Sequence, residues 1–171
     1  MKSFLTGLLF LLVLVSCTSK NEGKVKTTTD FDLEVAGTLS GNDAIVGDSV
    51  SIAKKWAGVV MNKLAIKDTV VFTNFRIVKT KTIDPSHQDI YIMIASAVKG
   101  SIKVGTTLHL EKDKFYFDVE DISGRKRSRI IICKGICEEE GCLPQVVISD
   151  NEKHLVCSSC VDCEKTTSQV Y

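Results

Sequence analysis

The sequence predicts an α+β domain in which one amphipathic helix packs on an antiparallel sheet of short strands, with a small cysteine-rich C-terminal hairpin. Three observations carry this prediction. One stretch only, from Asp48 to about Ala65, places apolar residues at three- and four-residue steps. Several later stretches alternate apolar and polar residues with a period of two, and turn-forming residues separate them. Short strands joined by short turns are typical of antiparallel sheets.

Length and composition limit the class of protein. The chain has 171 residues, of which 44% are apolar and 25% are charged, which suits one folded domain and excludes a disordered or low-complexity chain. The formal net charge is only +1, with 22 basic and 21 acidic residues. Proteins built to grip nucleic acid have a strong basic excess, so we expect no nucleic-acid partner.

The first 17 residues carry an export signal. The apolar run from Phe4 to Val15 is 12 residues long, whereas a bilayer-spanning helix needs about 20. Residues 1–16 are therefore interpreted as a signal peptide. The sequence Leu14-Val15-Ser16-Cys17 that ends it resembles the lipobox of bacterial lipoproteins. An ordinary signal peptide with a chance cysteine is the alternative.

The lipobox resemblance implies an anchor at Cys17. In that family a diacylglycerol alkylates the cysteine thiol, the bond before it is cut, and the new amino terminus is acylated with a fatty acid such as palmitate. Two or three acyl chains hold a protein stably on a membrane. Thr18 and Ser19 stand where enterobacterial lipoproteins retained at the inner membrane carry aspartate, so the resemblance implies the outer membrane of the bacterial cell envelope.

A tether follows the expected lipid attachment. Residues 17–30 form the lipidated N-terminus and a flexible spacer, because Thr18–Asp30 contains a single apolar residue, Val25. A coil of that length spans roughly 20 Å. The α+β domain is expected to occupy residues 31–132.

The helix comes first in that domain. Asp48 is a suitable N-cap, and one helical face carries an apolar stripe made of Ile52, Trp56, Val59, Val60 and Leu64. We interpret Trp56, the only tryptophan, as a core anchor rather than a ligand-stacking platform.

The strands are expected mainly after the helix. Residues 31–46 are expected to add one edge strand, and turn chemistry falls at 84–86, 99–101, 123–125 and 149–151. The period-two pattern predicts strands at 71–77, 90–95, 108–110, 115–120, 129–133, 145–148 and 154–157.

Motifs for catalysis are missing from the sequence. It has no glycine-rich phosphate loop, no Gly-x-Ser-x-Gly elbow and no His-Glu-x-x-His pair. Asp118, Glu120 and Asp121 can place two carboxylates on one strand face, a pair that a hydrolase could use, but a solvated strand face explains them without any chemistry. The histidines are interpreted as surface or packed side chains: His87, His109 and His154.

The strongest signal lies in the C-terminal segment, residues 133–171. Two cysteine triplets, C-x3-C-x4-C and C-x2-C-x2-C, flank a predicted hairpin. An exported protein meets an oxidising compartment, and setting Cys17 aside leaves an even number, so we expect disulfides. Six cysteines allow 15 pairings, which the sequence does not resolve. The six are Cys133, Cys137, Cys142, Cys157, Cys160 and Cys163.

Two other interpretations of the cysteines stay open. A zinc or iron–sulfur site would use Cys142, Cys157, Cys160 and Cys163, or His154 as one ligand. The C-x2-C-x2-C spacing resembles the start of a ferredoxin-type cluster motif, but that family's cysteine followed by proline is missing after Cys163. The same spacing suits thiol–disulfide exchange, although no βαβ unit precedes it.

These observations predict a membrane-anchored envelope lipoprotein with a non-enzymatic binding or structural role and no cofactor. Its partners would be the membrane, through the lipid at Cys17, and an envelope protein or ligand that the sequence does not identify. The alternative is a metal-binding or electron-transfer lipoprotein that uses the C-terminal cysteines. An envelope hydrolase using the strand carboxylates is a third, weaker hypothesis.

Overall fold

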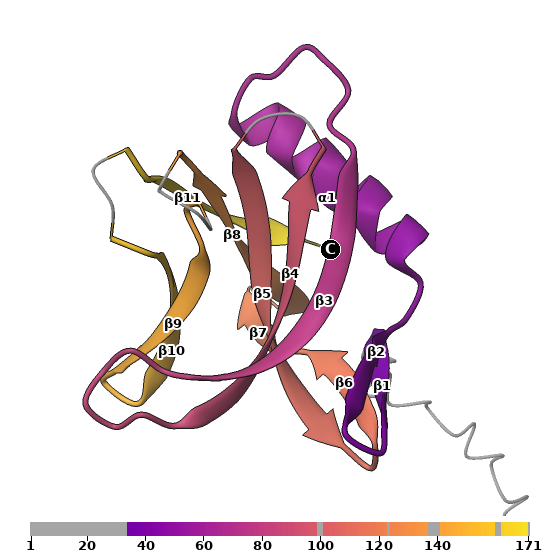
Figure 1. Cartoon of the computed structure of the whole chain (residues 1–171), viewed down its shortest axis with the longest axis vertical. Helices are drawn as coiled ribbons and strands as arrows, with labels where there is room; N and C mark the ends of the chain where they lie inside the picture. The colour runs from indigo at the N-terminus through magenta and orange to yellow at the C-terminus, as the bar shows by residue number, and fades with distance from the viewer. Residues whose placement is uncertain (1–33, 99–100, 123, 137–140, 160–161, 171) are drawn as a thin grey trace, which may run out of the picture. The chain divides into compact units, whose positions relative to one another are not determined.

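Strand β5 (Ile102–Glu111) organises a nine-stranded antiparallel sheet in the computed structural model (Figure 1). One edge of β5 pairs with β4, while the other edge pairs first with β8 and then with β6. The structure describes residues 34–98, 101–122, 124–136, 141–159 and 162–170. The predicted signal peptide, Cys17 and the tether lie outside these residues, as do Cys137 and Cys160.

The sheet branches at β5. Its main path runs β11-β8-β5-β6-β1-β2, with β3 paired to β4 and β7 paired to β8, and it curls as it proceeds (Figure 1). A separate hairpin joins β9 to β10. The other strands are β1 (Val35–Ser40), β2 (Asp43–Val46), β3 (Phe72–Lys81), β4 (Asp89–Ala97), β6 (Lys114–Phe117), β7 (Val119–Ile122), β8 (Arg125–Lys134), β9 (Pro144–Ser149), β10 (Glu152–Cys157) and β11 (Glu164–Val170).

The predicted helix is confirmed as α1 (Ser49–Lys63). The Asp48 side chain caps it by accepting a 3.0 Å hydrogen bond from the Ser51 amide. The core anchor is also confirmed, since Trp56 is only 2% exposed and packs against the rings of Phe72 and Phe75. No helix in the described part of the chain is long and apolar enough to cross a bilayer.

The central strands are buried on both faces. Along β4, Met93 and Ala95 face the core under α1, whereas Ile92 and Ile94 face a second core. The central strands β4 and β8 share this alternation, and the β9–β10 hairpin supplies Val146 and Leu155 to the second core. The sheet therefore lies between α1 and the hairpin, which occupy opposite sides of β3–β5 in Figure 1.

The hairpin is seated on the sheet at Gly105 of β5. A Cβ atom at this glycine would lie 2.5 Å from the Pro144 Cβ at the start of β9, a separation that real side chains do not reach. The β3–β4 loop holds the hairpin from another side, because the Ile83 amide donates to the Val146 carbonyl and the Ile148 amide to the Asp84 carboxylate, each at 2.9 Å.

The antiparallel α+β architecture with one helix agrees with the prediction, but several details differ. Residues 31–46 were expected to give one edge strand, and the described part gives the paired strands β1 and β2. The expected strand at 115–120 is interrupted at Asp118, between β6 and β7. Strands β3, β5 and β8 have 10 residues each, longer than the short strands expected. Strand β11 was not predicted, because Glu164–Val170 has no apolar alternation.

Gly105→Ala should destabilise the protein by about 1–3 kcal/mol, because the added methyl group pushes Pro144 and the hairpin away from the sheet. Gly58→Ala in α1 is the matched control. Its Cβ would meet nothing within 4 Å, and alanine stabilises a helix interior by about 0.5–1 kcal/mol. Urea denaturation of both variants measures the difference. Equal stability of Gly105→Ala and the wild type would contradict the close contact.

Candidate functional site

Two disulfides hold the open end of the hairpin, where the start of β9 pairs with the end of β10. Cys133 near the end of β8 is bonded to Cys157 at the end of β10, with a Cα–Cα distance of 5.7 Å. Cys142, just before β9, is bonded to Cys163, just before β11, with a Cα–Cα distance of 5.6 Å. The disulfide prediction is thus confirmed for these four cysteines, and both bridges join one triplet to the other.

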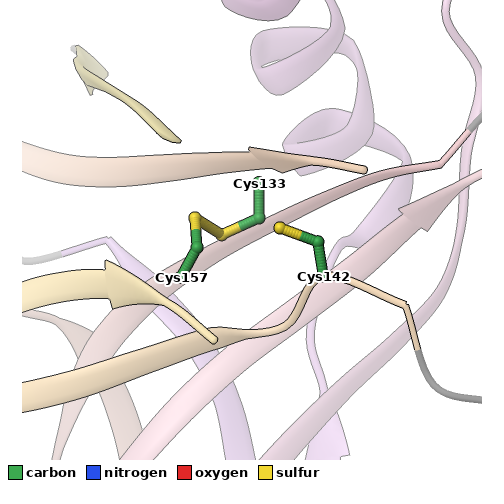
Figure 2. Close-up of side chains that lie close together, drawn as sticks. All are labelled: Cys133, Cys142 and Cys157. Carbon is green, nitrogen blue, oxygen red and sulfur yellow. A yellow bond between two sulfur atoms is a disulfide. The ribbon is translucent and has the colours of Figure 1, made fainter. Parts of the chain in front are cut away.

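Three of the four sulfur atoms form one cluster. The Sγ atoms of Cys133, Cys142 and Cys157 all lie within 4.8 Å of one another (Figure 2). Cys133 and Cys142 are buried, at 0% and 1% exposed, and belong to the second core, whereas Cys157 is partly exposed. The cluster therefore joins β8, β9 and β10 through sulfur contacts as well as bonds.

Three of the four cysteines predicted as alternative metal ligands form disulfides in this structure. Cys142, Cys157 and Cys163 are all bonded to other cysteines, and a metal takes up a thiolate rather than a disulfide sulfur. Cys160 lies outside the described residues. His154 is occupied in its own hairpin, where its Nε2 lies 3.3 Å from the Ser149 carbonyl oxygen. A metal site at these positions would need the reduced protein.

The three carboxylates that suggested a hydrolase each have a partner. Asp118 accepts from Lys153 at 2.9 Å. Glu120 forms a 2.6 Å ion pair with Arg129. Asp121 instead accepts from the Gly124 amide in the β7–β8 turn. The three carboxylates therefore serve three separate contacts.

Asp118 also binds His109 across the sheet, with a distance of 3.1 Å between Oδ1 and Nδ1. Burial raises the pKa of Asp118, but the ion pair with Lys153 and hydrogen bonds from Thr107 and His109 outweigh it, so the pKa lies below its ordinary value. Asp118 is consequently a carboxylate at neutral pH and is not available as a general acid. The ring of His109 stacks on Tyr116.

A polar cleft of about 530 Å³ lies where β10 meets the sheet. It combines both charge signs, with Lys153 and Arg129 set among acidic side chains. The sequence analysis did not identify Lys153 and Glu152 as candidate site residues, because charged residues in a hairpin are ordinarily exposed to solvent. The cleft is lined by Thr107, Asp118, Glu120, Arg129, Glu152, Lys153 and Leu155.

A second polar hollow, of about 720 Å³, lies between the end of α1 and β11. Its existence depends on β11, the strand that the sequence did not indicate. The lining residues are Val59, Asn62, Lys63, Arg129, Thr167, Ser168 and Gln169. The remaining histidine, His87, is in the β3–β4 loop, with Nδ1 3.3 Å from the Thr82 carbonyl oxygen.

The fold and the candidate site combine as follows. A curled antiparallel sheet is covered by one helix and by a disulfide-bonded hairpin, and ion pairs join basic and acidic side chains in the cleft beside β10. The chain matches no protein-family model, and no curated protein or solved structure shows significant similarity to it.

Asp118→Asn should lower the free energy of unfolding at pH 7 by about 1–2 kcal/mol, because it removes a charged acceptor from Lys153 and His109. The folded-state pKa of Asp118 lies below the unfolded value of about 3.9. Its contribution is therefore complete above that value and is lost as the pH falls below it. In denaturation experiments, the difference in stability between wild type and variant should narrow as the pH falls below that value and vanish below the folded-state pKa.

Glu111→Gln is the control for this experiment, since the exposed Glu111–Lys112 pair is separated by 4.0 Å and should contribute less than about 0.5 kcal/mol at any pH. A gap for Asp118→Asn that stays constant down to pH 3 would contradict the assigned ion pair.

Proposed function

We propose that this protein is a membrane-anchored lipoprotein of the bacterial cell envelope that acts as a binding or structural module rather than an enzyme. The observation that carries the proposal is the pair of disulfides, Cys133–Cys157 and Cys142–Cys163. Such bonds persist in exported proteins and are rare in the cytosol. They stand in a chain whose first 17 residues resemble an export and lipidation signal.

The chemistry of the candidate residues supports a non-enzymatic role. A hydrolase that uses two carboxylates needs one of them protonated and the other free to act on water or substrate. Here Asp118 is held ionised and Glu120 is bound to Arg129. Both carboxylates are used to fix the hairpin edge and strand β8, which is a structural task.

The binding surface that we favour is the cleft beside β10. Its walls come from β5, β7, β8 and β10, and the disulfide at Cys157 ties β10 to β8. A rigid concavity reduces the ordering cost of binding. Because the lining combines Lys153 and Arg129 with Asp118, Glu120 and Glu152, a polar partner that offers both charge signs fits it better than an apolar one.

A metal-binding or electron-transfer role is the second candidate, and the three-sulfur cluster of Cys133, Cys142 and Cys157 is the observation that favours it. This role requires thiolates instead of disulfides. Thiol titration of the protein purified without reductant separates the two proposals. Free thiols with stoichiometric zinc or iron would replace the first proposal by the second.

Cys17→Ser in the full chain should abolish labelling with radioactive palmitate and move the protein from the detergent phase to the aqueous phase, because the acyl chains supply the membrane affinity. Ser19→Ala, two residues away, is the control and should keep both properties. Density-gradient separation of the membranes tests the outer-membrane location. A Cys17→Ser protein that still partitions fully with membranes would refute the anchor.

A further inference from the structure

The cysteine cluster has a geometry that suits exchange between its two disulfides. The Cys142 Sγ lies within 4.8 Å of both sulfurs of the Cys133–Cys157 bridge. Figure 2 shows the Cys142 side chain directed at that bridge from the Cys133 side. Disulfides exchange when a thiolate attacks a neighbouring disulfide sulfur. The fold thus places each bridge within reach of a sulfur of the other.

Burial divides the four cysteines into two kinds. Cys133 and Cys142 are buried in the second core, and each is bonded to a partly exposed partner, Cys157 or Cys163. A small external thiol therefore meets an outer sulfur first, whichever bridge it attacks. In both cases the sulfur released is a buried one, and it lies beside the remaining bridge.

We propose that one reducing event shifts the bonding to a buried Cys133–Cys142 disulfide and leaves Cys157 and Cys163 as thiols. An external dithiol attacks the Cys163 Sγ, forms a mixed disulfide there and releases the Cys142 thiolate. That thiolate attacks the Cys133 Sγ, so the Cys133–Cys142 bond forms while the Cys133–Cys157 bond breaks. Cys157 leaves as a thiolate and takes a proton from solvent.

The balance closes with two electrons. The second thiol of the dithiol attacks its own sulfur in the mixed disulfide and releases Cys163, which is protonated, so the reagent leaves as a cyclic disulfide. The dithiol is oxidised by two electrons, and one of the two disulfides in the described part of the chain is reduced. Entry at Cys157 gives the same product, because the released Cys133 thiolate attacks Cys142 and displaces Cys163.

Lys103 supports the exchange electrostatically. It stands opposite Cys133 in the pairing of β5 with β8. Its Nζ lies 3.6 Å from the position that a Cβ on Gly141 would occupy, next to Cys142 in the chain. A nearby ammonium group favours a thiolate over a thiol, and Lys103 places one close to the residue that precedes Cys142.

The exchange would change what holds the hairpin. In the oxidised protein β10 is tied to β8 through Cys157, and β11 is tied to the start of β9 through Cys163. After the exchange only the start of β9 remains tied to β8, through Cys142. Strand β10, which carries Lys153 into the cleft beside Asp118, would then have no covalent tie to the sheet of its own and would depend on its pairing with β9.

The wild-type chain tests the proposal directly. It is treated with less than one equivalent of dithiothreitol, quenched with acid, alkylated and mapped by peptide mass spectrometry. In the species that has lost one disulfide among Cys133, Cys142, Cys157 and Cys163, we expect a Cys133–Cys142 bridge and alkylated Cys157 and Cys163. A species that keeps Cys133–Cys157 and carries label on Cys142 and Cys163 would overturn the proposal.

Two matched variants test the same step without a reductant. Cys163→Ser leaves Cys142 as the unpaired sulfur inside the cluster, so Cys157 should be alkylated at least about tenfold more than in the wild type. Cys142→Ser leaves Cys163 unpaired and removes the attacking sulfur, so Cys157 should stay protected in its bridge with Cys133. Equal protection of Cys157 in both variants would overturn the proposal.

Discussion

A two-stranded hairpin is marginally stable in water, yet in this protein such a hairpin must cover one face of the main sheet. Strands β4 and β8 carry apolar residues on both faces, and the isoleucines of the face under the hairpin, including Ile92 and Ile131, would meet solvent without β9 and β10. The disulfides Cys133–Cys157 and Cys142–Cys163 stabilise the folded hairpin, because they reduce the conformational entropy of the unfolded chain. The second core and the cysteine bridges therefore depend on each other.

The candidate functional features follow from the placement of this hairpin. Lys153 of β10 reaches Asp118 on the sheet, and this contact closes one wall of the polar cleft. The same placement brings Cys142 to the Cys133–Cys157 bridge. A binding role is consequently compatible with a hairpin whose attachment depends on its redox state. An exchange of the disulfides would alter the cleft without requiring α1 or its core to move.

The sequence is informative where one local signal suffices. Asp48 and the stripe through Trp56 locate the helix to within about two residues, and the even cysteine count predicts disulfides without their pairing. The second core could have been predicted from the β4 sequence, because it has apolar residues on both faces and such a run indicates a strand buried on both sides. Strand β11 is stabilised by its pairing with β8 and has no apolar pattern of its own, so only the tertiary structure reveals it.

Hydrogen exchange measured by mass spectrometry on the oxidised and the fully reduced protein tests the dependence of the outer layer on the disulfides. The account predicts that reduction removes the protection of amides in β9 and β10, while amides in α1 and in strands β4 and β5 stay protected by the core around Trp56. Unchanged protection of β9 and β10 after reduction, or simultaneous loss of protection in α1 and the hairpin, would contradict it.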